Sequence, residues 1–284
     1  MSSPSPLVTT DWLAAHLHEP NIRIADASWY LPSAGRNPRA EYETAHIPGA
    51  VFFDIDAISD QTTDLPHMLP EPAAFASSMK KLGLGDADMV VFYDGAGIYS
   101  SPRALWMMRA MGHAKAAVLD GGLPKWRREG RPMDAAAPLI PRRHFIPRVD
   151  QKLVRDFEAM RANLVTHEEQ VLDARSPARF RGEEQEPRPG VKPGHMPGAI
   201  NVYYSEVLAP DGTMRKTDEL ARIFANHGID LQKPIVTSCG SGVTAAILSL
   251  ALDIARAKST ALYDGSWTEW GARVDAPIET GPSR

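Results

Sequence analysis

The chain has 284 residues, of which 43% are hydrophobic and 23% charged, so its composition is that of a globular protein long enough for two domains. The net charge of −4 and the lack of any lysine or arginine block exclude nucleic acid and membrane surfaces as expected partners. The first residues do not resemble a secretory leader, no run of 18 apolar residues follows, and the single cysteine, Cys239, cannot form an internal disulfide. We therefore expect a protein of the reducing cytoplasm.

Four stretches of the first half return in the second half, in the same order and 144–149 residues later. The pairs are IRIADAS (22–28) with QVLDARS (170–176), AHIPGAVFFD (45–54) with GHMPGAINVY (194–203), VVFYDGAGIYSSPRAL (90–105) with IVTSCGSGVTAAILSL (235–250), and LDGGLPKW (119–126) with YDGSWTEW (263–270). Such a repeat predicts a duplicated domain. We expect the two copies at 1–134 and 150–284, joined by an extended, proline-rich linker at 135–149.

Within each copy, short apolar runs alternate with helical patterns. In the second copy, strands are expected at VLDA (171–174), AINVYY (199–204), PIVTSC (234–239) and STALYD (259–264), and helices at DELARIFANHG (218–228) and VTAAILSLALDIARA (243–257). This alternation predicts an α/β fold in which each domain has a parallel sheet with helices on both faces. Ligands of such sheets bind at the carboxyl ends of the strands, and Cys239 lies at such an end.

Cys239 stands at the start of a glycine-rich turn between a predicted strand and a predicted helix. A free cysteine is often only a small buried side chain. Here, Gly240 and Gly242 allow successive backbone N–H groups to converge on one point, and the helix from about Val243 adds its positive end. Because such a cradle stabilises a thiolate, the sequence favours a reactive cysteine over a structural one.

Two positions in these loops narrow the chemistry. A cysteine-dependent phosphatase needs an arginine six residues after the cysteine, where this chain has Ala245, so phosphoryl transfer is disfavoured. In the first copy, Asp94 holds the position of Cys239 and cannot act as a sulfur nucleophile. We therefore expect the first copy to be catalytically silent and to shape a cleft between the domains.

With these features the chain resembles the two-domain rhodanese-type sulfurtransferases over nearly its whole length. The loop CGSGVTA is similar to that of the 3-mercaptopyruvate sulfurtransferases, whereas thiosulfate-using rhodaneses typically carry charged or bulky residues after the cysteine, as in CRKGVTA. The other segments that resemble the mercaptopyruvate branch are SWYLPSAGRNPRAEYETAHIPGAVFFDID (28–56), PHMLPEP (66–72) and RFRGEEQEPRPG (179–190).

The resemblance implies a two-step reaction that needs no metal or organic cofactor. The Cys239 thiolate takes the sulfur of 3-mercaptopyruvate as a persulfide, pyruvate leaves as its enolate, and a thiol, a reduced thioredoxin or cyanide accepts the sulfur. The loop residues Gly240, Gly242, Val243 and Thr244 are expected to bind the substrate. Each step places negative charge where the loop amides can stabilise it.

The segment 178–190 contains three arginines, and its high proline and glycine content predicts a loop and not a helix. On composition alone these arginines are solvated loop residues that balance neighbouring glutamates. The resemblance assigns substrate binding to Arg179 and Arg188, and not to Arg181. Paired guanidinium groups suit the planar carboxylate and carbonyl of a 2-oxo acid.

The resemblance also implies a proton relay of Ser241, His67 and Asp56, which would deliver a proton to the departing enolate. Because His67 and Asp56 belong to the first copy, this relay places the site between the domains. His46 and His195 occur in both copies, so we interpret them as structural. Trp126, Trp267 and Trp270 are expected to be packing residues.

Two other functions stay open at this point. A thiosulfate sulfurtransferase would use the same loop with a different donor. A persulfide carrier or redox sensor would load sulfur without multiple turnovers on small donors. The default expectation for the oligomeric state is a monomer.

Overall fold

We describe a computed structural model of the chain, covering residues 5–283. These residues form two compact units. Unit 1 contains residues 5–61, Leu69–Asp150 and Pro210–Met214, and unit 2 contains Thr62–Met68, Gln151–Ala209 and residues 215–283. The short segment Thr62–Met68 therefore packs with unit 2, although it belongs to the first copy of the repeat.

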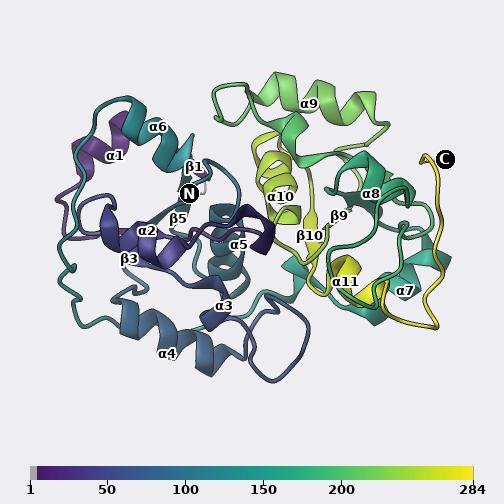
Figure 1. Cartoon of the computed structure of the whole chain (residues 1–284), viewed down its shortest axis with the longest axis horizontal. Coiled ribbons are helices and arrows are strands. Elements are labelled where there is room, and N and C mark those ends of the chain that lie inside the picture. The colour runs from purple at the N-terminus through teal and green to yellow at the C-terminus, as the bar shows by residue number, and fades with distance from the viewer. Residues whose placement is uncertain (1–4, 284) are drawn as a thin grey trace. The chain divides into compact units, whose positions relative to one another are not determined.

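Unit 1 is built on a five-stranded parallel sheet with the strand order β1-β5-β4-β2-β3. Figure 1 labels β1, β3 and β5 of this sheet. Its strands are β1 (Leu7–Val8), β2 (Ile22–Asp26), β3 (Val51–Phe52), β4 (Met89–Tyr93) and β5 (Ala116–Leu119). Its helices are α1 (Thr10–His16), the 3-10 helix η1 (Pro32–Ala34), α2 (Pro38–Thr44), α3 (Ile55–Ile58), α4 (Pro72–Leu82), α5 (Ser101–Ala110) and α6 (Gly122–Arg128).

Unit 2 repeats this architecture with the strand order β6-β10-β9-β7-β8. Its strands are β6 (Val154–Arg155), β7 (Gln170–Asp173), β8 (Ile200–Asn201), β9 (Ile235–Ser238) and β10 (Thr260–Tyr263). Its helices are the 3-10 helix η2 (Gln151–Leu153), α7 (Phe157–Thr166), α8 (Pro177–Arg181), the 3-10 helix η3 (Tyr204–Val207), α9 (Thr217–Asn226), α10 (Ala245–Ile254) and α11 (Ser266–Trp270). The two strand orders match position by position, so the fold follows the sequence repeat.

Helices cover both faces of each sheet, because every central strand is apolar on both sides. In unit 2, side chains of α7, α8 and α11 form one core with the sheet, while α10 packs on the opposite face against β9 and β10. In unit 1, α1, α2 and α6 share a core with the sheet, and α5 packs against β4 and β5. The predicted α/β class, with two parallel sheets flanked by helices, is confirmed.

The predicted packing role of three tryptophans is also confirmed. Trp126, Trp267 and Trp270 have no exposed surface, and the indole N–H groups donate to the carbonyls of Pro132, Lys192 and Pro277, respectively. These hydrogen bonds satisfy the one polar atom that each ring buries.

Other expectations differ from the structure in detail. The strand expected at 199–204 is only two residues long, because β8 lies at the sheet edge, pairs with β7 alone, and gives way to η3 at Tyr204. The segment 135–149 has no helix or strand, yet it packs on unit 1 through Phe145, which is 2% exposed and meets Phe75 edge to face. Among the described residues, no helix combines the length and apolar character needed to cross a bilayer.

Candidate active site

The loop that carries Cys239 connects β9 to α10, at the carboxyl end of the unit 2 sheet. Helix α11 anchors the first two carbonyls of this loop: Trp267 N donates to Cys239 O and Thr268 N donates to Gly240 O, both over 2.9 Å. All the described peptide bonds are trans, so the N–H of the next residue points opposite to each carbonyl. The N–H groups of Gly240 and Ser241 therefore point away from α11.

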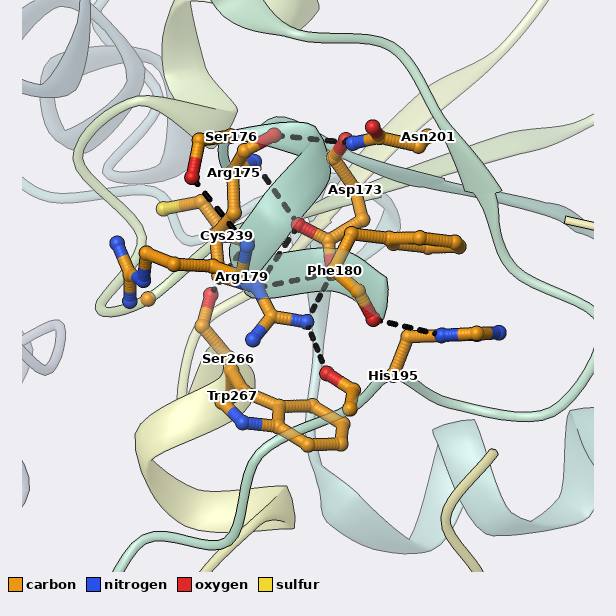
Figure 2. A network of polar contacts seen from close by, with 12 residues as sticks. Asp173, Arg175, Ser176, Arg179, Phe180, His195, Asn201, Cys239, Ser266 and Trp267 are labelled. Atoms are coloured by element: carbon orange, nitrogen blue, oxygen red, sulfur yellow. Dashed lines mark hydrogen bonds and ion pairs between the residues drawn. The ribbon is translucent and has the colours of Figure 1, made fainter. Parts of the chain in front are cut away.

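Two features fix the conformation of this loop. Gly242 has a φ of +77°, in the left-handed region that favours glycine. Ser266 also has a positive φ, of +49°, and its hydroxyl donates to Tyr263 O and accepts from Cys239 N over 3.4 Å (Figure 2). Strained backbone at a non-glycine residue persists only where its surroundings hold it. Here the strained serine supports the backbone of Cys239.

The equivalent loop of unit 1 already holds an anion, namely the carboxylate of Asp94. Asp94 Oδ1 accepts from the N–H of Ala96, and Oδ2 accepts from the N–H groups of Tyr99, Ser100 and Ser101, all over 2.9–3.0 Å. The Ser101 hydroxyl donates a further hydrogen bond of 2.7 Å to Oδ2. This loop design therefore gathers N–H groups around the side chain at its first position, and in unit 1 that side chain fills the cradle itself.

Arg179 lies on α8, and the interpretation that proline and glycine argue against a helix in this segment is wrong for its first residues. Pro177 occupies the first turn, where it costs no hydrogen bond, and the Ser176 hydroxyl accepts from Arg179 N over 3.4 Å (Figure 2). Gly182, with a φ of +78°, ends the helix in the left-handed conformation. The helix is short, but it fixes the direction in which Arg179 leaves the backbone.

The Arg179 guanidinium lies beside the Cys239 loop. A Cβ atom built on Gly240 would be 3.1 Å from Arg179 Nη2, and Figure 2 shows the guanidinium and the Cys239 thiol extending to the same side of the loop. Arg179 also forms an ion pair with Glu186, and its side chain is 21% exposed. A partly exposed cation thus lies beside the Cys239 loop, while Cys239 itself is buried, at 2% exposed.

Arg188 approaches the same loop through Thr268. Its Nη1 lies 3.5 Å from Thr268 Oγ1, and that hydroxyl donates to Gly240 O over 2.6 Å. Thr268 is not among the predicted site residues, because the stretch WTEW (267–270) indicates only the repeat and two packing tryptophans. The sequence holds a signal for it: Pro124 occupies the matching position in the first copy, and proline offers neither the hydroxyl nor an N–H. The third arginine, Arg181, pairs with the exposed Glu183.

His67 and Ser241 are in contact within unit 2. His67 Nδ1 lies 3.1 Å from Ser241 Oγ and 3.2 Å from Ser241 O. A protonated Nδ1 donates to one of these oxygens, whereas an unprotonated Nδ1 accepts from the serine hydroxyl. Both side chains are buried, and His67 has a φ of +63°, so a left-handed turn aims the imidazole.

Asp56, the third residue of the expected relay, lies on α3 in unit 1. Its Oδ2 accepts from the Trp29 indole N–H over 3.0 Å. The hydrogen bond between Asp56 and His67 that the relay requires stays a prediction.

The remaining expected residues lie at the end of the loop. Val243 is 2% exposed, and Thr244 is the N-cap residue of α10, which begins at Ala245 rather than near Val243. Their contact with a substrate stays a prediction. Among the described residues, no group of three or more histidine, cysteine, aspartate or glutamate side chains is arranged to hold a metal ion.

The two histidines predicted to be structural, His46 and His195, each bond to a backbone carbonyl and stack on an aromatic ring. His46 Nδ1 lies 2.8 Å from Tyr42 O, and its ring stacks on Tyr42. His195 Nδ1 lies 2.8 Å from Phe180 O, and its ring stacks on Phe180 (Figure 2). The same contact therefore recurs in both copies, as expected of a structural feature.

Comparisons with known proteins agree with this duplicated architecture. A family model described as the rhodanese-like domain matches residues 9–129 and again residues 156–273. The chain belongs to the rhodanese-like family. The first match contains β2 to β5 and the second contains β7 to β10, so the repeat in the sequence corresponds to two rhodanese-like domains.

Curated sulfurtransferases align with nearly the whole chain. The 3-mercaptopyruvate sulfurtransferase of Escherichia coli K12 is 45% identical and covers 96% of this chain and 97% of its own length. The mitochondrial thiosulfate/3-mercaptopyruvate sulfurtransferase 1 of Arabidopsis thaliana is 42% identical, over 99% of this chain and 79% of its own length. The crystal structure of SseA from Escherichia coli, a 3-mercaptopyruvate sulfurtransferase, superposes with a TM-score of 0.85 at 41% identity, covering 93% of this chain and 99% of SseA. The predicted resemblance to this group of enzymes is confirmed.

Proposed function

We propose that this enzyme transfers the sulfur of 3-mercaptopyruvate to a thiol acceptor through a persulfide on Cys239. The observation that carries the proposal is the position of the only cysteine in the chain, in a loop bordered by Arg179 and by the Ser241–His67 pair. An anionic nucleophile, a cation for a carboxylate and a proton carrier are the three groups that this reaction needs.

In the first half-reaction, the Cys239 thiolate attacks the sulfur of 3-mercaptopyruvate and a sulfur–sulfur bond forms. The carbon–sulfur bond breaks, its electron pair passes to the carbon, and pyruvate leaves as the enolate. Arg179 and Arg188 are proposed to bind the donor's carboxylate and carbonyl, and Ser241, backed by His67, to supply the proton that turns the enolate into pyruvate.

The backbone of the loop is proposed to stabilise the sulfur anion in both half-reactions. The N–H groups of Gly240 and Ser241 point away from α11, and the cradle around Asp94 in unit 1 supports the idea that this loop design gathers donors around an anion. Donors that are already oriented cost no reorganisation when charge develops.

In the second half-reaction, an acceptor thiolate attacks the outer sulfur, the sulfur–sulfur bond breaks, and the Cys239 thiolate is restored. The acceptor is proposed to be a small thiol, a reduced thioredoxin or cyanide. We further propose that the protein acts in the cytoplasm as a monomer, with the silent domain at 1–134, the linker at 135–149 and the catalytic domain at 150–284.

Intact-mass measurement tests the proposal. Incubation with 3-mercaptopyruvate should add one sulfur, about 32 Da, and a thiol should then remove it, as expected for a covalent intermediate. Cys239→Ser should neither gain the mass nor release pyruvate. Substantial turnover by this variant would overturn the assignment of Cys239 as the only nucleophile, and with it the silence of the first copy.

A second candidate donor is thiosulfate, because one relative carries both donors in its name. Turnover on the two donors decides between them: a higher kcat/KM on thiosulfate would favour this alternative. Sulfur loading with no multiple turnovers on either donor would instead indicate a persulfide carrier.

A further inference from the structure

Glu186 is a buried carboxylate in a segment that otherwise carries exposed charges. Its side chain is 4% exposed, whereas that of Glu183 in the same segment is 56% exposed. Glu186 Oε1 accepts from Arg175 Nη1 over 2.8 Å and from Arg179 Nε over 3.3 Å, and Oε2 accepts from Arg179 Nη2. One carboxylate thus holds two guanidinium groups.

The first of these groups, that of Arg175, is fixed at the end of β7. Its side chain is 1% exposed, forms a two-pronged ion pair with Asp173 (Figure 2), and lies 4.4 Å from the centre of the Trp267 ring. Its Nη2 also donates to Gly194 O over 2.7 Å. Although burial alone would lower the pKa of Arg175, the carboxylates of Asp173 and Glu186 raise it above the ordinary value. Glu186 is therefore tied to an immobile, charged anchor.

The second group, that of Arg179, is held along one edge. Glu186 takes the Nε and Nη2 side of the guanidinium, and Nη2 also borders Gly240. No residue that the structure describes bonds to Arg179 Nη1. Because a guanidinium is planar and its N–H directions are fixed, clamping one edge determines where the other edge points.

Glu186 also sets the charge of the cluster. Two carboxylates, Asp173 and Glu186, balance the two guanidinium groups of Arg175 and Arg179, so these four groups, which do not include Arg188, are neutral together. A neutral cluster recognises a donor by directed hydrogen bonds. A cluster with one net positive charge would also attract any compact dianion.

We infer that Glu186 is a positioning residue that sets the choice of sulfur donor. It clamps Arg179 so that the free edge accepts a planar carboxylate, and it cancels the extra charge that would favour a small dianion such as thiosulfate. This inference rests on the proposed function. It assigns Glu186 a role that acts through Arg179 and involves no contact with the donor.

The test is Glu186→Gln, which keeps the size of the side chain and removes its charge. KM for 3-mercaptopyruvate should rise at least about 10-fold, as for a lost charged hydrogen bond, with little change in kcat. The kcat/KM for thiosulfate should stay constant or rise. The matched control is Glu183→Gln, which breaks the exposed pair with Arg181 and should leave both donors unaffected.

A double-variant cycle separates this role from a structural one. In an Arg179→Ala background, Glu186→Gln should add nothing to the loss on 3-mercaptopyruvate, because the residue it acts through is gone. Additive losses, or equal losses on both donors in the single variant, would overturn the inference. Transfer of a preformed persulfide from Cys239 to a thiol serves as the test of correct folding, and its rate should be unchanged.

The proposed function and the Glu186 role can fail separately. If the parent enzyme takes no sulfur from 3-mercaptopyruvate, the proposed function fails. If the parent takes this sulfur but the ratio of kcat/KM on the two donors is unchanged in Glu186→Gln, only the Glu186 role is contradicted.

Discussion

The guanidinium of Arg179 occupies the space that a side chain on Gly240 would need. A Cβ atom at position 240 would lie 3.1 Å from Arg179 Nη2, which is tighter than nine in ten real Cβ contacts. Any side chain at this position must therefore displace the guanidinium, whereas the backbone makes no such demand, since the φ of Gly240 lies outside the left-handed region. A small residue after the cysteine and an arginine beside the thiol belong to one arrangement.

The first prediction concerns Gly240→Val. The branched side chain should displace Arg179 and raise KM for 3-mercaptopyruvate by about 10-fold or more, the loss expected for a charged hydrogen bond. Gly240→Ala should have a smaller effect, because the flexible end of Arg179 needs to move only slightly. Steady-state kinetics on both donors is the measurement. An unchanged KM in Gly240→Val would disprove the steric coupling.

The second prediction concerns Arg188→Gly. Loss of this guanidinium should raise KM for 3-mercaptopyruvate by about 10-fold to 150-fold, and much less for thiosulfate, which has no carboxylate. Arg181→Gly is the matched control, because Arg181 lies in the same segment and pairs with the exposed Glu183. Equal losses on both donors would point to a general electrostatic or folding effect of Arg188.

The third prediction separates the half-reactions. Ser241→Ala should slow sulfur loading from 3-mercaptopyruvate by about 10²–10⁴-fold, because it removes the proton donor to the enolate. Transfer of sulfur already on Cys239 to a thiol releases no enolate and should continue at a near-normal rate. Stopped-flow or quenched mass analysis measures the two steps, and loading at the parental rate would refute the relay.

His67→Asn extends this test to the histidine. Asparagine tolerates the left-handed conformation of residue 67, but its amide does not exchange a proton near neutrality, so loading should slow as in Ser241→Ala. The control is His167→Asn, since His167 is likewise left-handed, at the end of α7. A loading rate unchanged in His67→Asn would leave this histidine a structural role only.

The sequence alone was sufficient to predict the duplicated fold and the place of Cys239. Apolar strand runs and helical periodicity recur in both copies, and the carboxyl end of a parallel strand is a reliable position for a ligand. The expectation that the first copy is silent rests on one position, where Asp94 stands in place of Cys239. The hydrogen bonds from the loop N–H groups to Asp94 add a physical argument for it, because the carboxylate occupies the cradle itself.

The sequence could not predict which charged residues are buried. Glu183 and Glu186 lie in one proline-rich run, but Glu186 is buried in ion pairs with Arg175 and Arg179, whereas Glu183 is exposed and pairs with Arg181. Helix α8 was not predicted, for a local reason. Ser176 and Pro177 at its start and Gly182 at its end are helix signals, but the proline and glycine content of the longer segment 178–190 favoured a loop. The contact between His67 and Ser241 joins residues 174 positions apart, which no local pattern specifies.

The fourth prediction uses a difference between the two sheets. Asp26 and Asp173 end equivalent strands, but Asp173 pairs with Arg175, whereas Ser28 holds the matching place beside Asp26. Burial is the main cause that raises the pKa of Asp26 from 3.8 to about 6, against the lowering effect of the Ser28 hydrogen bonds. The folded state therefore binds this proton more tightly than the unfolded state.

The sign of the pH dependence follows. Below about pH 4, Asp26 is protonated in both states and costs nothing; above about pH 6 it is ionised in both, and the ionised form destabilises the fold by about 3 kcal/mol. Asp26→Asn, which stays neutral, should raise the free energy of unfolding at pH 8 by up to this amount, with the gain vanishing towards pH 4. Urea denaturation at several pH values, followed by tryptophan fluorescence, measures the difference. A stability gain in Asp26→Asn that does not change with pH would show that ionisation of this carboxylate is not its cause.

The matching variant of the second sheet, Asp173→Asn, should instead lower the free energy of unfolding by about 3–5 kcal/mol, because it leaves Arg175 buried with one carboxylate fewer.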